Sequence, residues 1–277
     1  MEMFKKVLNF YIDSSVHVAL SVFSLTWITL IEFDVSYAKN VLYFVFFATI
    51  TGYNFVKYFG IAKFHHRSLT SWLKIIQIFS FFCFICMCYF AFQLTFKTLF
   101  YIGIFGVITF LYAIPFLPKR FFLDSKHNLR SVSGLKIYLI ALIWCGVTVF
   151  FPLLENEYSV NDDVVVTAIQ RFLLIIVLML PFEIRDLRYD SLKLSTVPQK
   201  IGLKQTKLMG VILLFIIFFL EFFKDKIDVV SISILFIISG IILLFLVFSK
   251  IEQGKYYSAF WVEGLPVFWL LLLLMFN

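Results

Sequence analysis

Nine long runs of mostly apolar residues decide what this sequence can fold into. Each run has about the length, roughly 20 residues, that an α-helix needs to cross a lipid bilayer. Lipid cannot satisfy open backbone groups, so runs of this kind form helices. We therefore predict an all-α polytopic membrane bundle of about nine transmembrane helices, at residues 15–33, 40–58, 72–93, 98–118, 137–154, 165–182, 207–223, 229–249 and 260–276.

The composition supports membrane lipid as the surrounding solvent. Apolar residues make up 62% of the chain and charged residues 15%, whereas a soluble domain is about half apolar and about a quarter charged. The formal net charge of +7 does not indicate a nucleic-acid partner, because the basic residues fall between the apolar runs, where a membrane surface explains them. We expect a single integral-membrane domain over residues 1–277.

The distribution of Lys and Arg predicts the orientation. These residues gather at the N terminus and in every second connection, which includes segments 59–71, 119–136 and 183–206. Basic connections stay in the cytoplasm. We therefore expect a bacterial plasma (inner) membrane protein with a cytoplasmic N terminus and a C terminus outside. Arg171 and Glu221 fall near the outer ends of their spans, where we expect them to reach the membrane surface.

The most polar segment of the chain runs from Glu183 to Gly202. Glu183, Asp186 and Asp190 are spaced i, i+3 and i+7, so they share one face if the helix continues past Pro181. Acids on one stripe repel each other unless a cation lies among them. Magnesium (Mg2+) prefers carboxylate oxygens and usually keeps water and substrate phosphates as further ligands. The alternative interpretation is a solvated helix end with mixed charges.

A second helix start follows within the same segment. Thr196 and Gln199 have the spacing of a capping box, and Pro198 fits the first turn of a helix. The pattern predicts that the helix breaks at Gly202, since glycine commonly ends helices. We therefore predict a short loop after the acids, a helix beginning near Thr196 and a break at Gly202.

The series Arg185-Asp186-x-x-x-Asp190, followed by Thr196 and Gly202, resembles the second aspartate-rich motif of the UbiA superfamily. These proteins are intramembrane prenyltransferases that attach isoprenoid chains to aromatic or related acceptors. The resemblance implies a helical bundle around a central cavity. It also implies a prenyl diphosphate and a lipid-soluble acceptor, aromatic or a quinone precursor, as substrates, with Mg2+ as cofactor.

The resemblance also implies roles for individual residues. Asp186 and Asp190 would be catalytic and would bind the metal, Glu183 would assist as a metal ligand, and Asn54 would assist catalysis. The substrate-binding residues would be Lys57, Arg67, Lys119, Arg120, Arg185 and Glu263. Glu263 also qualifies by itself, because an acid within a membrane span is a functional candidate.

The first motif departs from the family pattern of Asn-x-x-x-Asp-x-x-x-Asp. Asn54 matches, but Tyr58 and Ala62 stand where the two aspartates would be. Lys57, Arg67, Lys119 and Arg120 can instead supply positive charge to a diphosphate. The bias of basic residues toward the cytoplasm accounts for the same cations without a ligand.

Two other functions remain open. A non-catalytic relative that binds a polyprenyl or lipid phosphate is consistent with the missing aspartates. A small-molecule transporter is less favoured, because transporters usually contain inverted repeats and interrupted helices, and the sequence has no convincing repeat.

Overall fold

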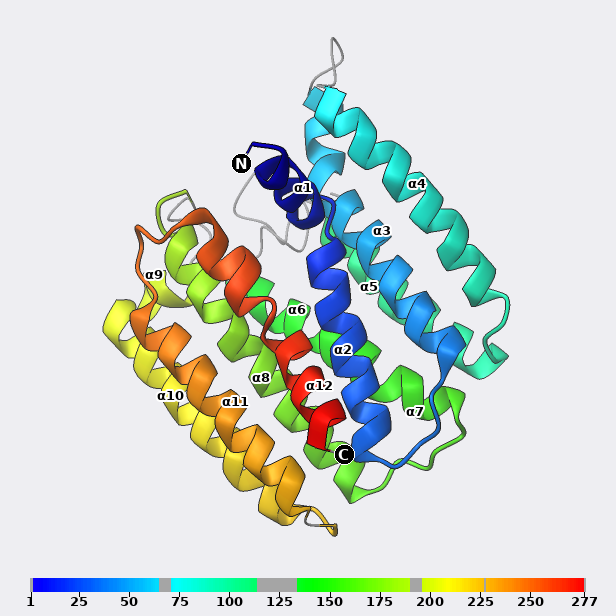
Figure 1. Ribbon diagram of the computed structural model, residues 1–277, viewed down its shortest axis with the longest axis vertical. Coiled ribbons are helices and arrows are strands. Elements are labelled where there is room, and N and C mark those ends of the chain that lie inside the picture. Colours follow the sequence, from blue (N-terminus) through cyan, green and yellow to red (C-terminus); the bar gives the residue numbers. More distant parts are fainter. Residues whose placement is uncertain (1, 65–70, 114–133, 190–195, 227, 277) are drawn as a thin grey trace, which may run out of the picture.

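A computed structural model describes residues 2–64, 71–113, 134–189, 196–226 and 228–276; at 59–64 and 112–113 the description covers the backbone alone. Within these ranges the regular structure is entirely helical (Figure 1). The elements in chain order are α1 (Glu2–Asp13), α2 (Val16–Glu32), α3 (Lys39–Phe64), α4 (Ser71–Ala91), α5 (Phe96–Ala113), α6 (Lys136–Cys145), η3 (Gly146–Phe150), α7 (Phe151–Glu155), α8 (Asp162–Asp186), α9 (Val197–Ile201), α10 (Leu203–Leu220), η5 (Glu221–Phe223), α11 (Val229–Phe248), η6 (Tyr257–Val262) and α12 (Leu265–Phe276).

The long helices have the length and composition of membrane spans. In the described part of the chain, six helical segments meet both conditions, or seven when the bent pair of α1 and α2 counts as one span. The six are Ser71–Ala91, Lys136–Glu155, Asp162–Asp186, Leu203–Phe223, Val229–Phe248 and Tyr257–Phe276. The predicted span 40–58 lies within α3, and α5 covers residues 98–113 of the predicted span 98–118, whose last residues lie outside the described ranges; α3 and α5 are not among the six. The predicted all-α membrane bundle is confirmed, and the number nine stays a prediction.

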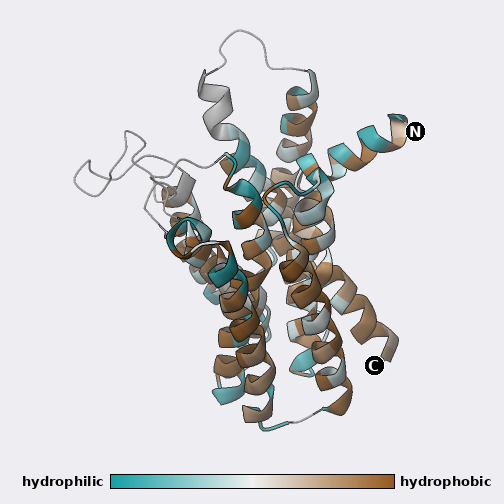
Figure 2. Cartoon of the chain, turned by 90° about the vertical axis from the view of Figure 1, so that its left-hand side faces the viewer, coloured by the Kyte–Doolittle hydropathy of each residue, from teal (hydrophilic) through white to brown (hydrophobic). Residues whose placement is uncertain are grey.

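The outer surface of the bundle is suited to lipid. Large apolar side chains such as Phe81, Phe82, Phe215 and Phe236 are exposed. Figure 2 shows apolar residues along most of the length of the long helices, with hydrophilic residues gathered toward the end that carries the N terminus. A surface of this kind is stable only in a bilayer, so the chain is an integral membrane protein.

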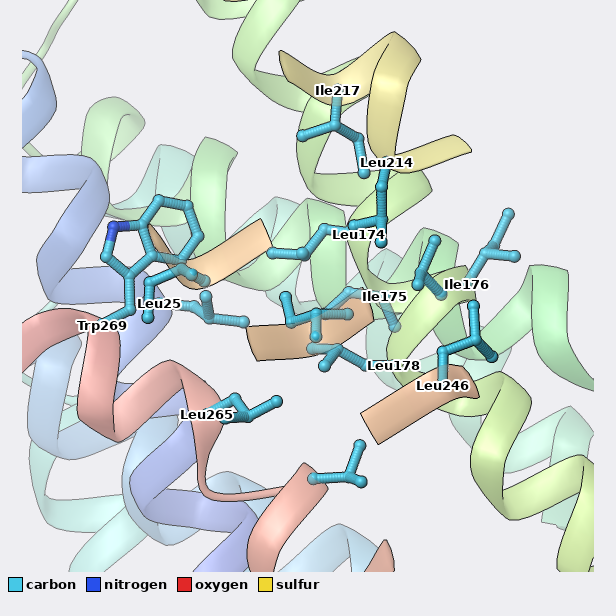
Figure 3. Packing of buried hydrophobic residues seen from close by; sticks show 14 of the residues in the cluster. Leu25, Leu174, Ile175, Ile176, Leu178, Leu214, Ile217, Leu246, Leu265 and Trp269 are labelled. Atoms are coloured by element: carbon cyan, nitrogen blue, oxygen red, sulfur yellow. The ribbon is translucent and has the colours of Figure 1, made fainter. Parts of the chain in front are cut away.

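Helices α2 and α8 form the centre of the packing. Helix α2 packs against α3, α12 and η3, while α8 packs against α6, α10 and α11. The largest buried cluster joins these elements (Figure 3) and includes Leu25 of α2, Leu178 of α8, Leu214 of α10 and Trp269 of α12. Gly210 lets α10 approach closely, because a Cβ atom there would overlap the side chains of Leu246 and Leu180.

Several long segments are interrupted rather than continuous. Helices α1 and α2 meet at an angle of 55°, and Ser15 at the break has a left-handed φ of 64°. The π-helical segments η3 and η6 each precede a helix with a proline in its first turn, Pro152 in α7 and Pro266 in α12. Proline lacks the N–H that an uninterrupted helix needs, so the changes of helix type coincide with these residues.

Candidate functional site

The end of α8 presents the acids that the sequence singled out. The helix continues through Pro181 to Asp186, as predicted. Glu183 is 1% exposed and Asp186 has 22% of its side chain exposed. These two carboxylates lie one turn apart on the same face. Asp190, the third predicted metal ligand, lies outside the described residues, as do Arg67, Lys119 and Arg120.

A lysine that no motif identified lies between the two acids. Lys136 is the first residue of α6, which packs along α8. Its Nζ lies 3.2 Å from Oε1 of Glu183 and 3.7 Å from Oδ2 of Asp186. The ammonium group therefore bridges the carboxylates that were predicted to hold a metal.

Arg185 neutralises the other oxygen of Asp186. Its Nε and Nη2 donate to Oδ1 of Asp186 at 2.9 and 2.8 Å, and its guanidinium lies 5.3 Å from the centre of the Phe182 ring. Asp186 thus contacts two cations, one on each oxygen. Within the described residues, no group of three or more His, Cys, Asp or Glu side chains could hold a metal ion.

Glu263 joins this end of the bundle from another direction. It directly follows η6, and its own backbone carbonyl accepts a hydrogen bond from Oγ of Ser21 in α2. The carboxylate of Glu263 lies within electrostatic range of the cations of Lys57 and Arg185. Three predicted substrate-binding residues, Lys57, Arg185 and Glu263, therefore lie at the same end of the bundle, on α3, α8 and the start of the last span.

The first-motif segment of α3 contacts the break between α1 and α2. Asn54 is 3% exposed. Its Oδ1 accepts from Oγ of Ser15 at 2.8 Å, and its Nδ2 donates to the Ser14 carbonyl at 2.9 Å and to Oγ of Ser80 at 2.7 Å. This network occupies the hydrogen-bonding groups of the Asn54 amide, and it fixes the point where α1 leaves α2.

Two neighbouring residues reinforce the same break. The Lys57 ammonium donates to the carbonyl of Asp13 at 3.0 Å, and the Tyr58 hydroxyl donates to the same carbonyl at 2.8 Å. Asp13 ends α1, where helix carbonyls lack partners within the helix. Tyr58, which replaces an aspartate of the family pattern, therefore caps α1. The structural description of Ala62 does not extend to its side chain.

A pocket lies at the opposite end of the bundle. Its lining includes Glu32, Thr167, Gln170, Arg171 and Trp269. Arg171 is 2% exposed and donates to the Leu25 carbonyl and to Oγ1 of Thr29. The expectation that Arg171 reaches the membrane surface is wrong. Its position along α8 suggested snorkelling, but the side chain points between helices and finds its partners inside the bundle.

Two comparisons of the sequence found no match: no protein-family model fits it, and no curated protein matches it. Solved structures do match. A structure of digeranylgeranylglyceryl phosphate synthase superposes with a TM-score of 0.56 at 16% identity, over 99% of this chain and 97% of that one. A UbiA homologue from Archaeoglobus fulgidus, bound to GPP and Mg2+, superposes with a TM-score of 0.59 at 11% identity, over 95% of this chain and 97% of that one.

The likeness defines the class of fold. Nearly the whole length of both chains takes part, so the protein has the fold of the UbiA-like membrane prenyltransferases. The fold expected from the second aspartate motif is therefore confirmed. At these identities the likeness concerns the fold, and the function has to be argued from the site.

Proposed function

We propose that the protein binds a prenyl diphosphate at the polar end of α8 and transfers the prenyl group to a lipid-soluble acceptor, aromatic or a quinone precursor. The observation that carries this proposal is the UbiA-like fold over nearly the whole chain together with the acids Glu183 and Asp186 on one face of α8. The structurally similar UbiA homologue from Archaeoglobus fulgidus binds GPP, which is a prenyl diphosphate.

The chemistry requires charge stabilisation at the diphosphate. When the allylic C1–O bond breaks, the electron pair leaves with the diphosphate and a carbocation remains on the prenyl chain. The acceptor then forms a bond to C1 and loses a proton. Cations that face the departing diphosphate favour this step. Lys57 and Arg185 are the described candidates, and Arg67, Lys119 and Arg120 are proposed on the sequence alone. Asn54, predicted to be catalytic, would act as a positioning residue, because its hydrogen bonds hold the segment of α3 that carries Lys57.

The residues as they stand do not fit a bound Mg2+ ion. Glu183 and Asp186 are the right kind of ligand, but the Lys136 ammonium lies between them. Mg2+ needs oxygen ligands at about 2.0–2.1 Å in octahedral geometry. Glu183, Asp186 and Asp190 would therefore serve as Mg2+ ligands only after the Lys136 ammonium moves away from Glu183 and Asp186.

The same observation favours a second candidate function. A relative that binds a polyprenyl or lipid phosphate without turnover needs cations for the phosphate but no activating metal. Lys136 and Arg185 already balance the charge of Glu183 and Asp186. The protein would then hold its ligand in the bilayer without breaking the C1–O bond.

The location follows from the same sequence pattern. We propose a bacterial plasma (inner) membrane, with the N terminus and the polar end of α8 in the cytoplasm and the C terminus outside. The basic residues at this end support that orientation. Cytoplasmic placement would also give a water-soluble diphosphate group direct access to Arg185 and Lys57.

Binding of geranyl diphosphate to the purified full-length chain in nanodiscs tests the proposal. We expect Arg185→Gln to weaken binding by about tenfold or more, since a charge-assisted hydrogen bond contributes roughly 1.5–3 kcal/mol. Asp163→Asn, at the other end of α8, is the matched control and should bind like the parent. Equal binding by Arg185→Gln and the parent would remove Arg185 from the site.

Turnover separates the two candidate functions. Incubation with geranyl diphosphate and a quinone-precursor acceptor should release inorganic diphosphate and yield a prenylated product detectable by mass spectrometry. Tight binding without release of diphosphate would favour the non-catalytic function.

A further inference from the structure

We propose that Lys136 is the internal counter-cation of this site and competes with divalent metal ions for Glu183 and Asp186. The inference rests on the proposed position of the diphosphate site, but metal binding can be measured without any diphosphate. According to this inference, a metal ion can bind Glu183 and Asp186 only when the Lys136 side chain has left them.

The geometry places one ammonium group between two carboxylates. The Lys136 Nζ lies 3.2 Å from Glu183 and 3.7 Å from Asp186, and the two acids come from successive turns of α8. Glu183 is almost completely buried. A buried carboxylate needs a compensating charge close by, and Lys136 supplies it from a different helix.

Arg185 leaves only one oxygen of Asp186 for a further cation. Its two nitrogen atoms both contact Oδ1, while Oδ2 faces Lys136. A metal ion that binds Glu183 and Asp186 together would therefore use the place that the ammonium occupies. The metal ion and the Lys136 ammonium exclude each other, because two positive charges repel at such close range. The carboxylate oxygens of Glu183 and Asp186 also cannot coordinate both cations at once.

The position of Lys136 in the chain allows it to leave. It is the first residue of α6, and 21% of its side chain is exposed. Its long, flexible side chain can turn toward water. A bound diphosphate would offer the ammonium group a new anionic partner and free the acids. Diphosphate and metal should therefore strengthen each other's binding, and the coupling is reciprocal.

Mn2+ binding to the full-length protein in nanodiscs, followed by electron paramagnetic resonance without any diphosphate, tests this inference. We expect weak binding by the parent and at least about tenfold tighter binding by Lys136→Met, which removes the competing charge. Lys136→Gln, which keeps a polar side chain, should also gain affinity. Lys136→Arg should remain as weak as the parent.

Lys207→Met is the matched control. Lys207 lies at the same end of the bundle, but its ammonium donates to the carbonyls of Val247 and Ser249 rather than to acids. Its loss removes one positive charge without freeing a carboxylate, so Mn2+ affinity should not change.

A second measurement needs no substitution of Lys136. Saturating Mn2+ should increase reductive methylation of the Lys136 amine in the parent several-fold, because the metal displaces the amine from the acids.

Three results of the Mn2+ measurement would overturn the inference. They are tight Mn2+ binding by the parent, no gain of Mn2+ affinity in Lys136→Met and Lys136→Gln, or a gain of Mn2+ affinity that survives an added Glu183→Gln. None of these results depends on geranyl diphosphate, so they are distinct from failure of the proposed function.

Discussion

Replacement of Arg171 by methionine should strongly destabilise the bundle without affecting the diphosphate site. Arg171 is 2% exposed and lies in the half of α8 that begins at Asp162, away from Glu183 and Asp186. Its guanidinium donates to the Leu25 carbonyl at 3.2 Å and to Oγ1 of Thr29 at 3.3 Å. It also lies 3.7 Å from Oε2 of Glu32 and 5.5 Å from the centre of the Trp269 ring.

The contacts set the magnitude. Interhelical hydrogen bonds in membranes contribute on average about 0.6 kcal/mol each, so the two bonds account for about 1 kcal/mol. Removing one partner of a buried ion pair costs roughly 3–5 kcal/mol, mainly because the other charge remains. Glu32 is 16% exposed, and methionine retains part of the apolar stem, so we expect the lower end. The free energy of unfolding of Arg171→Met should fall by about 3 kcal/mol.

Unfolding in mixed micelles with increasing SDS, followed by the fluorescence of the five tryptophans, measures this loss. Glu32→Gln added to Arg171→Met should recover part of the stability, since it removes the unpaired charge. Arg188→Met, at an exposed position in the turn that follows α8, is the control and should stay within about 0.5 kcal/mol of the parent. A similarly small change in Arg171→Met, or strictly additive effects with Glu32→Gln, would refute the reasoning.

Three further outcomes are expected. Asn54→Ala should lower the free energy of unfolding by about 2 kcal/mol in the same assay, because three hydrogen bonds at the α1–α2 break are lost. A cysteine at Lys200 should resist a membrane-impermeant maleimide in intact cells, whereas one at Lys226 should react; the reverse would invert the orientation. Asp228→Ala should cost about 1 kcal/mol at pH 7, because Asp228 accepts hydrogen bonds at the start of α11. Hydrogen bonds from Ser231 lower the pKa of Asp228. The stabilisation by Asp228 is therefore present above the ordinary carboxyl pKa and disappears as the pH falls through the lowered pKa. Melting curves of Asp228→Ala and the parent should then converge at acidic pH.

Local periodicity was sufficient to predict the acidic face of α8. Glu183 and Asp186 follow helical spacing, and the helix beyond Pro181 keeps that spacing intact. The break at Gly202 was also predictable, because glycine commonly ends helices, and the structure confirms it with a φ of 81° at this residue. These features depend on residues close together in the chain.

Contacts between distant segments could not be predicted in the same way. Lys136 reaches Glu183 only because α6 packs along α8, and no spacing in the sequence encodes that pairing. The contacts of Asn54 depend on the left-handed Ser15 at the α1–α2 break. Arg171 was misplaced for a related reason, since its depth along α8 was known but the helices facing it were not.

The π-helical segment η6 has a consequence for comparing this chain with others. A π-helical turn holds one residue more than an α-helical turn, because its hydrogen bonds run from i to i+5. Each residue of an α-helix advances by about 100° around the axis. When this chain is aligned with one whose last span is α-helical throughout, the alignment needs a one-residue gap at Tyr257–Val262. Without the gap, Glu263 would be assigned to the wrong side of the last span. Deleting one residue from this segment should turn the Glu263 carboxylate away from Lys57 and Arg185, although these three side chains would still be present.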